Sequence, residues 1–170
     1  MLRIINNLKP FFKDCYRRIS VREYSRIRKI SPPTASKFLG EYKKLGLLKK
    51  QEERQYFYYF ANKDNSIFID LSRIYWKNKL EEVGLIKKIE QEFLSPVIIL
   101  FGSLAKAETK QDSDIDIAVF TPTKKSIDLR GFGKKLKRDI QLFIFKNKKE
   151  IKNPNLFDNI LNGYKIQGSW

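Results

Sequence analysis

The sequence predicts an α+β protein with two modules joined by a helical connector. Apolar residues recur at helical spacing through the first half, and a continuous apolar run at 97–101 is typical of a buried strand. The charge is also uneven: of the formal +16 on 170 residues, +10 lies in residues 1–62 and +6 in residues 96–170. We therefore expect modules at 1–62 and 94–170, with the connector at 63–93.

Composition limits the chemistry that the chain can perform. The sequence has no His and a single Cys, Cys15, which excludes His-dependent catalysis, His-ligated metals and an intrachain disulfide. This agrees with a location in a reducing cytoplasm, and no apolar run reaches the ~18 residues of a membrane span. With 35 Lys and Arg against 19 Asp and Glu, the expected partner is a polyanion. A nucleic-acid binder and an enzyme based on carboxylates and metal ions both remain.

The first module is expected to contain three helices followed by a hairpin. Helical periodicity covers 2–17, where Pro10 disturbs the pattern, and then 21–29. A third helix follows Ser31, which suits an N-cap, and ends near Gly46. Ser20 is the equivalent cap for the second helix. Strands are predicted at 47–50 and 55–60, with a charged tip between them.

This order of elements resembles a winged helix-turn-helix domain over residues 1–62. The resemblance implies that the helix beginning at Pro32 enters the major groove of double-stranded DNA, and that the hairpin tip contacts the backbone or the minor groove. The side chains that it assigns to DNA are Thr34, Ser36, Lys37, Lys43, Lys44, Lys50 and Arg54. A basic face that is only solvated, or one that binds protein, is the alternative.

The connector carries one long apolar stripe, interrupted by Gly84. Two interpretations follow from residues 64–93. The stripe forms a homodimer interface, as suits a protein that reads paired DNA half-sites, or it packs against the chain's own modules.

The second module contains a turn and two acidic residues with a defined spacing. The apolar strand at 97–101 runs into Gly102-Ser103 and a predicted helix, whose free N–H groups suit a phosphate, with Lys106 one turn further. In the next predicted strand, at 113–120, Asp114 and Asp116 alternate and therefore point to the same face. Two carboxylates so placed can hold Mg²⁺ together with phosphate oxygens.

This combination resembles the minimal nucleotidyltransferases of the DNA polymerase β superfamily, over roughly residues 94–170. The resemblance implies a mixed sheet backed by helices and two Mg²⁺ ions, held at Asp114 and Asp116 when a nucleoside triphosphate (NTP) is bound. It assigns the NTP itself to Gly102, Ser103 and Lys106. The implied activity is the transfer of a nucleoside monophosphate to a hydroxyl acceptor.

Two positions depart from the family pattern. Ala107 stands where such sequences often have Gly after the basic residue. The family takes a third carboxylate from a neighbouring strand, expected here at 139–145, where Asp139 and Gln141 share a face. The position at the centre of that strand is Gln141, which cannot replace a carboxylate, and Asp139 serves only if the strand is shifted by two residues.

Three functions follow from these features. The first is a Mg²⁺-dependent nucleotidyltransferase with a DNA-binding head. The second is a catalytically weak or inactive transcriptional regulator that senses nucleotide, as Gln141 suggests. The third comes from the family resemblance, because minimal nucleotidyltransferases often act as antitoxins that bind a helical HEPN-type toxin.

Overall fold

The computed structural model describes residues 2–170, apart from the side chain of Leu2, and divides the chain into two compact units. Unit 1 holds the chain up to Tyr75 together with Ala107–Gln111, and unit 2 holds Trp76–Lys106 and Asp112–Trp170. The boundary falls inside a helix, whereas the sequence suggested a separate connector at 63–93. None of the helices within residues 2–170 is both long and apolar enough to cross a bilayer.

Unit 1 has the predicted order of helices and hairpin. Its elements are α1 (Leu2–Lys13), β1 (Ile19–Ser20), α2 (Val21–Arg28), α3 (Pro32–Lys44), β2 (Leu48–Glu53), β3 (Tyr56–Ala61) and the start of α4 (Ser66–Glu82). The strands form an antiparallel sheet in the order β1-β3-β2. α1 continues through Pro10 but ends at Lys13, four residues before the predicted end.

The predicted caps and turn of unit 1 are present, with one shift at the hairpin. Ser20 Oγ accepts from Glu23 N, and Ser31 Oγ accepts from Thr34 N. The strands of the hairpin are longer than predicted, so that the tip is Arg54-Gln55 rather than 51–54. Both tip residues have positive φ, at 49° and 68°, as a two-residue type I′ turn requires.

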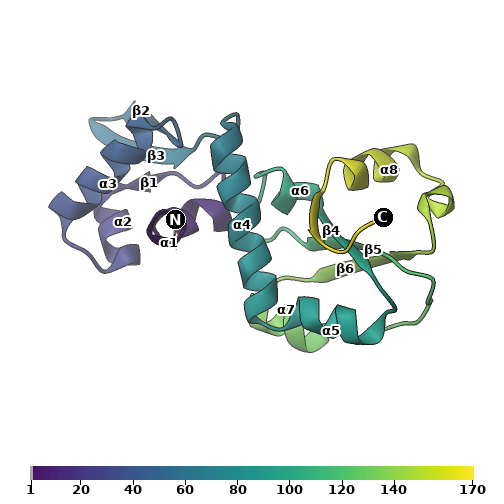
Figure 1. The fold of residues 1–170 in the computed structure, drawn as a ribbon. Coiled ribbons are helices and arrows are strands. Elements are labelled where there is room, and N and C mark those ends of the chain that lie inside the picture. The colour runs from purple at the N-terminus through teal and green to yellow at the C-terminus, as the bar shows by residue number, and fades with distance from the viewer. Residues whose placement is uncertain (1) are drawn as a thin grey trace. The chain divides into compact units, whose positions relative to one another are not determined.

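Unit 2 is built on a four-stranded mixed sheet in the order β6-β5-β4-β7. After the end of α4 its elements are α5 (Leu85–Glu92), β4 (Val97–Phe101), α6 (Gly102–Ala105), β5 (Ile115–Phe120), α7 (Arg130–Leu136), β6 (Ile140–Phe145), a 3₁₀ turn η1 (Lys148–Glu150), α8 (Pro154–Leu161) and β7 (Tyr164–Gln167). β5 and β6 are parallel, and the other neighbouring pairs are antiparallel. In Figure 1, α8 lies on one side of this sheet and α5 and α7 lie on the other.

The face of the sheet toward α8 carries a buried cluster. Its members are Val97, Ile99, Phe101, Ala118, Phe120 and Ile160. Because side chains alternate along a strand, this is also the face that receives Asp116, two residues before Ala118. We call it the α8 face.

The apolar stripe of the connector is buried in the protein itself. Leu71, Leu80, Ile86 and Ile89 are all less than 10% exposed, whereas Ile67 is 59% exposed. Gly84 separates α4 from α5 with a φ of +83°, as its place in the pattern suggested. This burial agrees with packing inside the chain, and a homodimer through 64–93 stays a prediction.

Candidate functional site

Strand pairing brings the turn and the aspartates together. β4 and β5 are antiparallel, with Phe101 opposite Asp116, so Gly102 begins where the carboxylate of Asp116 lies. Asp116 is half-buried, and Asp114 lies just before the first residue of β5. The strand therefore starts later than the predicted 113, but both carboxylates still lie on the α8 face.

Gly102 is required by its surroundings as well as by its backbone. Its φ is +69°, in the left-handed region that favours glycine. A Cβ atom added at Gly102 would stand 2.2 Å from Oδ2 of Asp116. No other residue fits there without displacing the carboxylate, so the turn and Asp116 form one compact constellation.

The helix after the turn is shorter than the sequence suggested. α6 ends at Ala105 after four residues, so its dipole is smaller than that of the longer helix we expected. Its N-cap residue, Phe101, makes no side-chain cap hydrogen bond. Gly102 and Ser103 nevertheless open this helical turn beside Asp116, and their contact with a phosphate stays a prediction.

Lys106 follows α6 instead of lying within it. Its ammonium group donates to Asn159 Oδ1 of α8 at 2.6 Å. The contact ties the end of the turn to the helix that covers the α8 face. A contact between Lys106 and a phosphate stays a prediction.

Gln141 occupies the position at which the resemblance implies a third carboxylate. In the parallel pairing of β5 and β6 it lies directly opposite Asp116. Its Nε2 atom donates to Oδ2 of Asp114 at 2.7 Å. Asp139 precedes β6, is exposed, and accepts from Ile115 N through its backbone carbonyl at 2.8 Å. The interior of the strand therefore offers an amide where the family pattern has an acid.

The site concentrates negative charge in a partly buried place. Burial raises the pKa of the Asp116 carboxyl, and the neighbouring charge of Asp114 raises it further. Among residues 2–170, no group of three or more His, Cys, Asp and Glu side chains gathers in a way that could hold a metal. Two carboxylates are nevertheless enough for Mg²⁺, because this ion completes its shell with water and phosphate oxygens.

Arg138 is a supporting residue that the sequence analysis missed. Its guanidinium donates to the carbonyl of Ser113, the residue before Asp114, and stacks 5.0 Å from the ring centre of Trp76. In the sequence Arg138 is one cation within a basic stretch. Only the folded structure distinguishes Arg138 from the other cations of this stretch, because its hydrogen bond reaches a residue 25 positions away in the sequence.

The residues assigned to DNA lie in unit 1 on α3 and the hairpin. All except Thr34 are exposed: Ser36, Lys37, Lys43, Lys44, Lys50 and Arg54. Thr34 is partly buried, and its hydroxyl lies 2.8 Å from the hydroxyl of the cap residue Ser31. On the hairpin, Lys50 Nζ lies 3.4 Å from the ring centre of Phe57.

Comparison with known proteins finds a family match that includes the site region. Residues 84–166 match the family described as Polymerase beta, Nucleotidyltransferase. A solved structure titled "Crystal structure of the toxin-antitoxin with AMP-PNP" aligns at 20% identity with a TM-score of 0.40, covering 55% of this chain and 73% of that chain. No curated protein matches the sequence. Residues 84–166 are therefore similar to the nucleotidyltransferase domains of this family.

Proposed function

We propose that unit 2 binds an NTP with Mg²⁺ and transfers its nucleoside monophosphate slowly to a hydroxyl acceptor. The observation that carries this proposal is the close approach of Gly102 and Asp116, where a Cβ would stand 2.2 Å from the carboxylate. A backbone turn packed this closely against a carboxylate places its N–H groups beside a cation ligand, an arrangement that suits a phosphate bridged to a cation. The family match of residues 84–166 supports the same chemistry.

Asp114 and Asp116 are the residues that would hold the metal. Their donor set fits Mg²⁺, because both are carboxylates and the pKa of Asp116 is raised by burial and by Asp114, a repulsion that a cation removes. Two ions are expected when the NTP is bound. When bound, they supply charge neutralisation for the phosphates.

The chain's own residues position the reactants. The N–H groups of the turn at Gly102 and Ser103 would receive the triphosphate. The acceptor oxygen bonds to the α-phosphorus while the bond from this phosphorus to the α–β bridging oxygen breaks. Pyrophosphate leaves, and the hydroxyl proton passes to water. Gln141 cannot take that proton, and its amide already donates to Asp114. We therefore expect slow transfer.

Unit 1 would bind double-stranded DNA. Residues 1–62 carry 15 basic and 5 acidic side chains, which favours phosphate contacts. The exposed cations of α3 and the exposed, tightly turned hairpin support a groove-binding arrangement. The winged-helix assignment is part of this proposal.

Labelled substrate tests the leading proposal. The full chain is incubated with Mg²⁺ and each α-³²P-labelled NTP, with DNA, tRNA or whole-cell protein as acceptor. We expect label on one acceptor class with the wild type and the Lys87→Ala control, and none with Asp114→Ala/Asp116→Ala. Transfer that persists in the double variant would contradict the site assignment.

A nucleotide-sensing regulator is the second candidate, and two observations favour it. Gln141 bonds to Asp114 in place of a catalytic acid. In addition, the loop between the turn and the aspartates, Ala107–Gln111, packs as part of unit 1, where the carbonyl of Thr109 accepts from Cys15 N at 2.7 Å. Nucleotide bound at Gly102 and Asp116 would therefore contact the two residues that flank a loop held in unit 1.

The regulator predicts an effect on DNA affinity without turnover. Mg²⁺ with a non-hydrolysable NTP analogue should change the affinity of the full chain for its DNA, and Asp114→Ala/Asp116→Ala should abolish the change. An affinity that is the same with and without nucleotide would exclude sensing. An antitoxin that binds a HEPN-type toxin stays a prediction from the family resemblance.

A further inference from the structure

A second candidate site lies on the α8 face, away from the aspartates. It is a pocket of about 540 Å³, lined among others by Val97, Phe120, Asn147, Lys148, Lys149 and Trp170. Phe120 follows Asp116 by four residues on β5, so the two ends of the face are roughly 13 Å apart along the strand. The pocket and the aspartates therefore share one face of one sheet.

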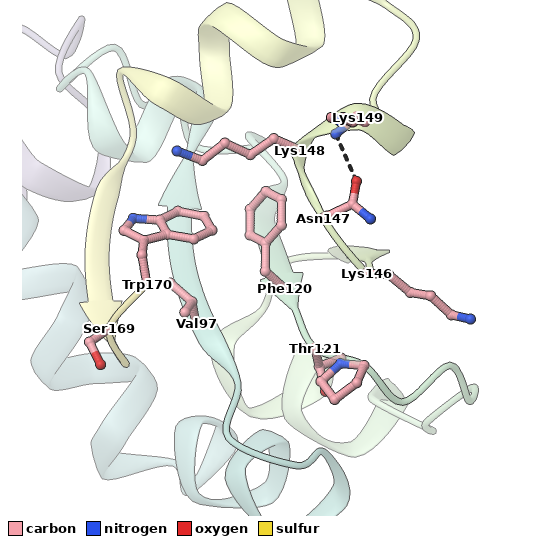
Figure 2. A pocket seen from close by; sticks show the side chains of 10 residues that line it. Val97, Phe120, Thr121, Lys146, Asn147, Lys148, Lys149, Ser169 and Trp170 are labelled. Carbon is pink, nitrogen blue, oxygen red and sulfur yellow. Dashed lines mark hydrogen bonds between the residues drawn. The ribbon is translucent and has the colours of Figure 1, made fainter.

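Aromatic rings form the base of this pocket. Trp170 packs edge-to-face on Phe120 with 4.9 Å between ring centres. Phe120 is 5% exposed, whereas Trp170 is 64% exposed. Figure 2 shows the two rings next to each other at the pocket. A buried ring thus supports an indole whose remaining surface is open to a flat ligand, and nucleobases stack on such rings.

Lysines surround the rings. Lys148 Nζ lies 4.2 Å from the ring centre of Trp170, and Figure 2 shows its side chain reaching toward the indole. The nearby carboxylate of Glu150 is neutralised by Lys124 at 3.1 Å and by the backbone N–H of Lys146. Within residues 2–170, no ion pair engages Lys148 or Lys149. Their charge is therefore available to an anion.

A polar side chain completes the arrangement. Asn147 Oδ1 accepts from Lys149 N at 3.0 Å, as the dashed line in Figure 2 marks. This bond fixes the side-chain amide at the edge of the pocket. The indole can stack on a base, the amide can bond to the hydrogen-bonding edge of that base, and the two lysines can bind its phosphate.

We propose that this pocket binds a nucleotide of single-stranded nucleic acid, with the base on Trp170 and the phosphate at Lys148 and Lys149. The assignment deepens the proposed function and rests on it, because it names the acceptor. A free mononucleotide would occupy only the pocket, at one end of the α8 face. A strand held at the pocket would pass over Phe145 and Phe143 of β6, which are only partly buried, because the centre of the face is covered. Its terminal hydroxyl would then lie at Asp114 and Asp116.

Oligonucleotide binding without Mg²⁺ or NTP tests the pocket alone. A fluorescently labelled strand of about ten nucleotides, within the usual site size, is titrated with the full chain and followed by anisotropy. We expect Trp170→Ala to weaken single-strand binding about tenfold, because it removes the ring on which the base stacks. Lys148→Ala/Lys149→Ala should weaken it by a similar factor, because it removes the contacts to the phosphate. Duplex binding should stay unchanged in both, and Lys87→Ala should change neither.

A second readout reports the base directly. In a Trp76→Phe chain, Trp170 is the one remaining tryptophan, and its emission should be quenched by the single strand. Wild-type affinity in both pocket variants would overturn the proposal. Competition by polyaspartate at the same concentration as the strand would overturn the assignment to nucleic acid, because it would show that only charge is recognised. Failure of NTP transfer is read separately, because these titrations contain no NTP.

Discussion

Unit 1 and the aspartate site of unit 2 represent two kinds of recognition surface. In unit 1 the candidate DNA contacts are exposed cations spread over α3 and the hairpin, and each acts through its charge. In unit 2 the candidate chemistry depends on a few atoms at fixed separations, such as the 2.7 Å bond from Gln141 to Asp114. We therefore expect graded effects from substitutions in unit 1 and steep effects from substitutions at the site.

The largest expected effect comes from Gly102→Ala. The new methyl group would meet the carboxylate of Asp116, and alanine tolerates the positive φ poorly. We expect Mg²⁺–NTP affinity to fall about 100-fold, the upper range for disturbing a metal ligand. Isothermal titration calorimetry measures it.

Gly131→Ala is the matched control, because a Cβ at Gly131 meets nothing within 4 Å and its φ is not positive. Wild-type nucleotide affinity in Gly102→Ala, with the fold retained by circular dichroism, would contradict the phosphate role of the turn.

A smaller effect, in the opposite direction, is expected from Gln141→Glu. The substitution places a carboxylate opposite Asp116 and removes the amide that donates to Asp114. Tighter Mg²⁺ binding and a transfer rate about tenfold higher should follow, since a third acid both ligates and accepts a proton. Gln141→Leu removes the amide without adding an acid and should give no gain. A rate that is equal in all three chains would show that this position does not limit transfer.

The sequence predicted what is encoded locally. The caps at Ser20 and Ser31, the break at Gly84 and the pairing of Asp114 with Asp116 on one face all follow from short patterns. Contacts between distant residues could not be predicted in this way. The stacking of Arg138 on Trp76, and the place of Ala107–Gln111 in unit 1, depend on how the chain folds back on itself.

The pocket at Trp170 illustrates the same limit. Its aromatic rings are 50 residues apart in sequence, so no short pattern could indicate that they pack together. The structure supplies what the pattern lacked, because β7 pairs with β4 and brings the tail beside Phe120.

The smallest effect is expected in unit 1, from Lys43→Ala/Lys44→Ala. Both side chains are exposed in the last turn of α3, so their removal should leave the fold intact and weaken duplex binding about fivefold near physiological salt. The slope of log affinity against log salt concentration should become shallower by about 1.8, which corresponds to two phosphate contacts. Lys87→Ala removes one exposed lysine of α5 and controls for the loss of a positive charge outside unit 1. An unchanged slope in the double variant would exclude α3 from the DNA interface. A loss of affinity of several hundredfold would show that unit 1 also recognises DNA through a few fixed contacts, as unit 2 is expected to recognise its nucleotide.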